Sequence, residues 1–187
     1  SNFNFYKNQQ FSNIEDNSIQ DAKLVKADIL IKTNQTKIID LGERFVEIKA
    51  WKTGHTDNDL SVYDKKSKVF WSENIFVERT PSIRASILGW RQNLEEISKM
   101  DIKLIIPGHG KVLEKDKAIK PMINYFDRII SKLRDFQKNN KSLQESINII
   151  LQESILEPSE VNKENWILFN EYHYSNITKA FTELEWE

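Results

Sequence analysis

The chain has 187 residues, of which 39% are hydrophobic and 11% aromatic, which is enough for a packed core. Its 27 basic and 28 acidic residues nearly cancel, and no apolar run approaches the roughly 20 residues that cross a bilayer, so we expect no nucleic-acid partner and no membrane span. There is no cysteine, which excludes disulfides, thiolate metal sites and cysteine nucleophiles.

The first half of the chain, from about residue 24, has the short apolar pattern of β-strands. Gly42-Glu43 and residues 65–67 are typical of turns between antiparallel neighbours. The predicted strands are 28–32, 37–41, 44–51, 60–64 and 68–71.

The second half is predicted to be mainly helical. A helix at about 84–99 has an apolar stripe, and a short buried strand at 103–106 ends at Pro107-Gly108. Further helices are predicted at about 117–138, 142–154 and 172–184. This order predicts an α/β (α+β) fold, with a mostly antiparallel sheet followed by C-terminal helices.

Two histidines and one acid each follow a predicted strand, in or near a turn rich in small residues. These are His55 in Gly-His-Thr-Asp, Glu73 in Ser-Glu-Asn and His109 in Pro-Gly-His-Gly. Ligands gather at strand ends, and imidazole and carboxylate are the donors that zinc takes when thiolate is unavailable. The alternative is that the histidines are hydrogen-bonded turn residues and the acid is solvated. Spacing leaves both interpretations open.

Four other polar side chains each have a functional and a structural interpretation. We expect Asp57 to cap its turn, whereas Asp59 is a candidate to orient a ligand imidazole. We expect Arg79 to form a structural ion pair, and its planar guanidinium would alternatively suit an anionic substrate group. His173 lies on or before the last helix, where a packing or capping role is expected.

Three segments together carry a family resemblance. They read WKTGHTDNDLSVYD, KVFWSENIF and KLIIPGHGKV, and they resemble the second half of the metallo-β-lactamase fold. HTDNDL, the Arg-Thr-Pro-Ser segment with its later Gly-Trp, and the ending LFNEYHYSNITKAFTELEWE resemble the zinc metallohydrolases associated with quinoprotein systems. The likeness extends from Lys37 to Glu187.

The resemblance assigns roles by position. His55 matches the third histidine of the family's zinc site, His109 matches its last histidine, and Glu73 stands where the family has a metal-bridging Asp. Ser72-Glu73 replaces the usual Gly-Asp, so the carboxylate is one methylene longer. The family's His-x-His-x-Asp-His motif is missing from the chain.

The resemblance implies one half of an αββα sandwich. Residues 1–116 would form a partial metallo-β-lactamase domain, and residues 117–187 a helical extension packed on it. The uncovered sheet face, with Ile38, Phe45, Ile48 or Val62, would then be exposed and would favour a homodimer or another partner.

Three hypotheses follow. The chain is the C-terminal part of a zinc hydrolase of a small-molecule substrate, catalytic only with its upstream half; or a non-catalytic binding module with a degenerate metal site; or a metal-free structural domain. In a complete member, one or two zinc ions would activate a water, whereas this part alone would bind zinc weakly or not at all. The subgroup resemblance also implies a periplasmic location.

Overall fold

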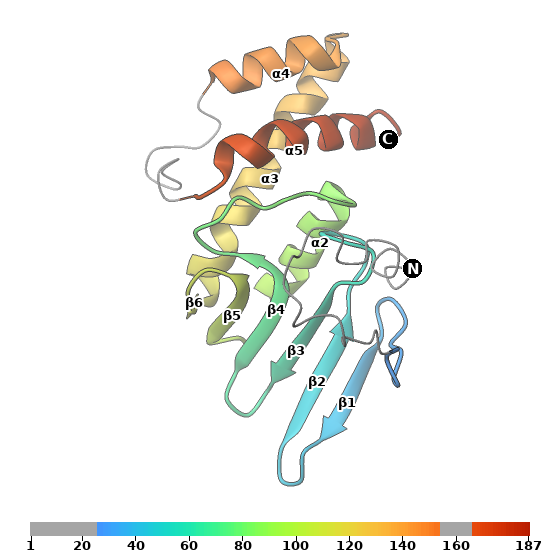
Figure 1. The fold of residues 1–187 in the computed structure, drawn as a ribbon, viewed down its shortest axis with the longest axis vertical. Helices are drawn as coiled ribbons and strands as arrows, with labels where there is room; N and C mark the ends of the chain where they lie inside the picture. Colours follow the sequence, from blue (N-terminus) through green and yellow to red (C-terminus); the bar gives the residue numbers. More distant parts are fainter. Residues whose placement is uncertain (1–25, 154–165) are drawn as a thin grey trace, which may run out of the picture. The chain divides into compact units, whose positions relative to one another are not determined.

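A computed structural model describes residues 26–153 and 166–187 (Figure 1). The chain divides into two units, residues 1–30 and residues 31–187, and all the regular elements named below belong to the second unit. Within the described part, no helix is long and apolar enough to span a membrane.

The centre of the second unit is a six-stranded sheet in the order β1-β2-β3-β4-β5-β6. All neighbouring strands are antiparallel except β4 and β5, which are parallel. The strands are β1 (Thr36–Asp40), β2 (Phe45–Ala50), β3 (Leu60–Asp64), β4 (Val69–Phe76), β5 (Leu104–His109) and β6 (Leu113–Glu114).

Helix α2 (Ile87–Ser98) provides the crossover that a parallel strand pair requires. Ser86 caps its N-terminus, because the Ser86 side chain accepts a hydrogen bond from the Gly89 amide. Gly89 lies against the β2–β3 loop so closely that a Cβ atom there would be 1.9 Å from the Thr53 carbonyl oxygen. The helix is therefore fixed directly against the loop that carries His55.

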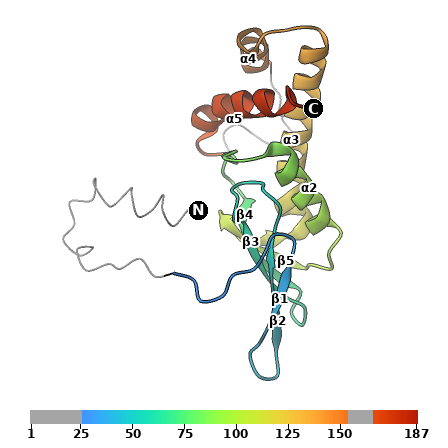
Figure 2. The ribbon, with the colours of Figure 1, turned by 90° about the vertical axis from the view of Figure 1, so that its right-hand side faces the viewer.

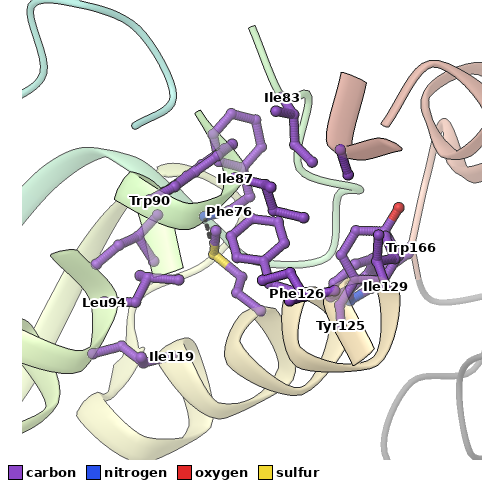
Figure 3. Close-up of a cluster of buried hydrophobic side chains, with 14 of the residues drawn as sticks. Phe76, Ile83, Ile87, Trp90, Leu94, Ile119, Tyr125, Phe126, Ile129 and Trp166 are labelled. Atoms are coloured by element: carbon purple, nitrogen blue, oxygen red, sulfur yellow. Dashed lines mark hydrogen bonds between the residues drawn. The ribbon is translucent and has the colours of Figure 1, made fainter. Parts of the chain in front are cut away.

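The core lies between the sheet and the helices. Figure 2 shows α2 on one side of the sheet, and Phe70 and Ile105, which are paired across β4 and β5, are fully buried there. Figure 3 shows the ring of Trp90 from α2 in the same cluster as Phe76 and Phe126. These aromatic contacts join the end of β4, the crossover helix α2 and the helices that follow the sheet into one core.

Three helices follow the sheet. They are α3 (Lys115–Lys138), α4 (Leu143–Gln152) and α5 (Phe169–Leu184). Helix α3 packs on α2 and on β4, β5 and β6, and α5 packs on both α2 and α3. Ser142 and Glu145 form a capping box at the start of α4. The predicted domain boundary at 116/117 falls inside the first turn of α3.

The sequence predicted a sheet followed by helices, and this fold class is confirmed. Three details were wrong. The strand predicted to end at Pro107-Gly108 continues through this dipeptide, so His109 is the last residue of β5 and does not follow it. Residues 28–32 are not a strand, because alternation alone cannot show that a partner strand is present. The strand predicted at 68–71 extends to Phe76, so Glu73 lies within β4 and not after it.

The expected exposed apolar face also needs correction, because side chains alternate along a strand. Ile38 and Phe45 are 59% and 57% exposed and share the face of Phe70 and Ile105, beyond the reach of α2 near the sheet edge. Ile48 pairs with Val62 on the opposite face. There the register aligns one half-buried apolar side chain from each of β2, β3, β4 and β5, namely Ile48, Val62, Trp71 and Ile106.

The contact between α2 and the His55 loop gives a prediction. Glycine to alanine inside a helix ordinarily stabilises a protein by up to about 1 kcal/mol. Gly89→Ala is expected instead to destabilise by about 1–3 kcal/mol, because the added methyl group overlaps the Thr53 carbonyl. Urea unfolding measures this, with the exposed α2 residue Gln92→Ala as control. A more stable Gly89→Ala variant would show that the helix and loop are not in contact.

Candidate functional site

His55 lies in the loop between β2 and β3, and its ring is held on three sides. Nδ1 is 2.8 Å from the Ser82 carbonyl oxygen, and the ring centroid is 4.8 Å from that of Trp90 and 5.1 Å from that of Phe76. Since a carbonyl only accepts, Nδ1 carries the hydrogen, and the neutral ring keeps a lone pair on Nε2. Burial lowers the pKa of His55, which favours this neutral form.

His109 is the last residue of β5, and its ring contacts the same phenylalanine, Phe76, as the His55 ring does. Its centroid is 4.7 Å from that of Phe76, so Phe76 contacts both histidines. Burial and the neighbouring Arg79 guanidinium lower the pKa of His109. Gly108, the preceding residue of β5, lies very close to β4: a Cβ atom on it would be 2.2 Å from the Glu73 carbonyl oxygen. Glycine is therefore required where the backbone of β5 approaches that of β4.

Glu73 lies on β4 with an exposed side chain. Its Oε1 accepts a hydrogen bond of 3.2 Å from the Leu60 amide at the start of β3. Partial desolvation raises the pKa of Glu73, and the nearby Asp59 carboxylate adds to this increase. One carboxylate oxygen of Glu73 thus holds the start of β3 through Leu60, and the Glu73 carboxyl group lies close to the loop that carries His55.

Asp59, rather than Asp57, fastens the His55 loop. Its Oδ1 accepts hydrogen bonds from the Thr56 amide at 2.9 Å and the Thr56 hydroxyl at 2.7 Å, whereas Asp57 is exposed. The expected capping role of Asp57 was therefore wrong. Asp59 is 1% exposed, and within the described part its Oδ2 has no hydrogen-bond partner. Burial raises the pKa of the Asp59 carboxyl group.

Arg79 is in the segment between β4 and α2. Within the described residues, its polar contacts are with the His109 ring and the Tyr172 hydroxyl, and none is with a carboxylate. The expected structural ion pair of Arg79 is therefore wrong for the described part of the chain. Tyr172 comes from α5, 93 residues further along, and no local pattern pointed to it.

His173, the third histidine, has the expected packing role. It is 4% exposed on α5, and its Nδ1 is 2.8 Å from the Tyr125 hydroxyl. Its ring stacks on Phe169 with a centroid distance of 4.5 Å.

The structure brings His55 and His109 to one aromatic ring and Glu73 to the neighbourhood of Asp59. Among residues 26–153 and 166–187, however, no three His, Asp or Glu side chains are grouped so as to hold a metal ion. The metal roles of His55, Glu73 and His109 thus stay predictions. Ser82 and Trp90, which orient His55, were not predicted, although both belong to motifs that the resemblance had singled out.

Comparison with solved structures identifies the fold. The stereoselective inverting sec-alkylsulfatase Pisa1 from a Pseudomonas species matches 86% of this chain with a TM-score of 0.65 and 12% identity, and a double mutant of that enzyme matches equally well with 11% identity. A metallo-β-lactamase family protein from Thermus thermophilus matches 70% of the chain with a TM-score of 0.52 and 9% identity.

The chain has part of the metallo-β-lactamase fold. It spans 27% of the alkylsulfatase and 45% of the Thermus protein. No family model matches the sequence, and no curated protein matches it significantly. Structural similarity at these identities shows the metallo-β-lactamase fold alone.

The buried carboxyl group of Asp59 predicts a pH dependence. The folded state holds the Asp59 proton more tightly than the unfolded state does, so the stability from this proton is present below the ordinary pKa of about 4 and is lost as the pH rises through the raised value. Asp59→Asn keeps an oxygen for Thr56 and removes the buried charge. The difference in unfolding free energy between the variant and the parent chain is expected to favour the variant more at about pH 7 than at about pH 4.

Urea unfolding of both chains at the two pH values measures this difference. The control is Asp57→Asn, which changes an exposed carboxyl group in the same turn. Equal effects of Asp59→Asn at both pH values would contradict the assignment of Asp59 as a buried, destabilised carboxylate.

Proposed function

We propose that this chain is the C-terminal part of a metal-dependent hydrolase of the metallo-β-lactamase fold, related to the zinc metallohydrolases associated with quinoprotein systems. The observation that carries the proposal is the pair of histidines, His55 and His109, whose rings both contact the ring of Phe76. Both imidazoles have lowered pKa values, and a neutral imidazole is the form that binds a metal.

The residues present fit part of a metal centre but not a whole one. His55 has the arrangement of a ligand, with Nδ1 bonded to a backbone carbonyl and Nε2 left for a metal. Within the described residues no third His, Asp or Glu joins the two histidines as a metal-binding group. No catalytic step through zinc follows from these residues alone. The proposal therefore assigns the remaining ligands to a part of the protein outside this chain.

The sheet gives independent support for a missing half. The row of Ile48, Val62, Trp71 and Ile106 crosses four strands on the face opposite α2 and is only half-buried. A two-layer sandwich covers such a face with a second sheet. The coverage of 27% and 45% of the matched structures is consistent with this interpretation. In the absence of that second sheet, the face would favour a homodimer.

The substrate in this proposal is a small molecule, and the sites of the matched proteins do not identify it. The alkylsulfatase is by its name an enzyme that acts on secondary alkyl sulfates, which makes ester-type bonds the first class to assay. A periplasmic location is part of the proposal and rests on the subgroup resemblance.

One observation favours a second candidate function, a non-catalytic binding module. The Arg79 guanidinium lies next to His109, and a fixed positive charge opposes the binding of a divalent cation there. Ser72-Glu73 in place of Gly-Asp, with one Glu73 oxygen bonded to Leu60, points the same way.

Zinc content separates the two functions. The protein that includes the upstream half is purified and its zinc measured by mass spectrometry, for the parent and for His55→Ala. The hydrolase proposal predicts at least one zinc per chain in the parent and a clear loss in His55→Ala. Asp57→Ala, an exposed change in the same turn, is the control and is expected to keep the metal. A parent protein without zinc would favour the binding module.

A further inference from the structure

The Arg79 guanidinium is surrounded by aromatic rings. Its Cζ atom is 5.9 Å from the ring centroid of Phe76 and 5.7 Å from that of Tyr172. Its Nη1 is 3.1 Å from Nδ1 and 3.3 Å from Nε2 of His109. The lone pairs of an imidazole diverge in the plane of the ring, so an atom at similar distances from both nitrogens lies over the ring face. The Arg79 guanidinium is thus oriented by contacts with three aromatic rings.

This arginine differs from the others that the described residues place in ion pairs. Those are Arg44 with Asp64, Arg91 with Asp127, and Arg134 with Glu187. Arg79 is half-buried, its contacts in the described part include no acid, and its Nε is buried without a hydrogen-bond partner. A partly desolvated cation without a counter-charge is unfavourable unless a ligand supplies the negative charge.

The position of Arg79 is built by the C-terminal segment. The Thr80 amide donates to the Ile167 carbonyl at 3.1 Å, and the Ile167 amide donates to the Glu78 carbonyl at 3.1 Å. These two bonds form a parallel bridge on either side of Arg79. The backbone of this arginine is therefore fixed by residue 167, and not by its neighbours in sequence.

Helix α5 is fixed to the same loop through Asn176. The Asn176 side chain accepts a 2.9 Å hydrogen bond from the Ile83 amide and donates one of 2.6 Å to the Pro81 carbonyl. Asn176 is fully buried, and Tyr172 lies one turn before it on α5. This anchoring brings the Tyr172 hydroxyl to 3.3 Å from Nη2 of Arg79.

We propose that Arg79 and Tyr172 bind an anionic group of the substrate, either a carboxylate or a tetrahedral oxyanion such as sulfate or phosphate. The guanidinium supplies N–H donors and charge. The tyrosine hydroxyl accepts from Nη2 and has its own hydrogen left to donate to the same anion. The inference deepens the proposed function, since it gives the substrate class of that hydrolase and makes the C-terminal helix part of its site.

The test uses the 187-residue chain in the presence of a chelator, so that metal binding does not contribute. Sodium sulfate, sodium phosphate and sodium acetate are titrated at constant ionic strength, and the amide and arginine Nε–H resonances are followed by NMR. Saturable shifts at Arg79 and Tyr172 are expected with at least one probe, and the three probes distinguish a tetrahedral oxyanion from a carboxylate.

The decisive variant is Arg79→Gln, which is expected to weaken anion binding by about tenfold or more. The matched control is Arg84→Gln, which removes the same charge from an exposed residue of the same loop and is expected to bind as the parent does. Tyr172→Phe removes one hydroxyl from a side chain that stays packed, and is expected to weaken binding about threefold. This second variant keeps the test valid if Arg79→Gln does not fold.

The proposal would be overturned if Arg79→Gln bound the anions as tightly as the parent does, or if Arg84→Gln lost as much affinity as Arg79→Gln. The absence of saturable shifts in the parent would also overturn it. The assay contains no metal, so a negative anion titration would not bear on zinc binding. The zinc measurement would still decide the proposed function. Conversely, if the protein contains no zinc but still binds anions through Arg79, the anion site stands and belongs to a non-catalytic binding module.

Discussion

Phe76 stands at the last position of β4, and its ring contacts both histidines of the candidate site as well as Trp90 in the core. Its backbone amide is 3.2 Å from the sulfur of Met122 on α3, so the same residue is held from the helical side. Protein interiors are close-packed and transmit small displacements. The positions of His55 and His109 relative to each other therefore follow from how one phenylalanine is packed.

The two neighbouring loops depend on this arrangement in different ways. The His55 loop is fastened within itself by Asp59 and from outside by the Ser82 carbonyl. The end of β5 at His109 is set by the close approach of Gly108 to the Glu73 carbonyl. The His55 imidazole is thus held by a hydrogen bond of its own, whereas at His109 the close approach fixes the backbone, although both look like glycine-turn histidines in the sequence.

The sequence was informative where local chemistry decides the outcome. Alternating apolar residues gave β1 to β5 within a few residues, apart from the extension of β4 and the continuation of β5 through Pro107-Gly108, which was predicted to end it. Alternation failed at 28–32, where the described residues form no strand, and could not tell which face Ile38 and Val62 occupy until the register was known. Asp57 and Asp59 were indistinguishable as caps because both are short acids in one turn. The contact of Tyr172 with Arg79 depends on how a distant helix docks, and no residue near either one encodes it.

The bridge between Arg79 and Ile167 has a consequence for how the molecule opens. Hydrogen bonds on either side of Arg79, together with those of Asn176, connect the start of α5 to the loop between β4 and α2. Segments connected in this way open together, as one cooperative unit with one opening free energy. Hydrogen exchange at the amides of Thr80, Ile83 and Ile167 should then proceed at a common free energy, and fraying at the start of α5 would reach the candidate site without any change in the sheet.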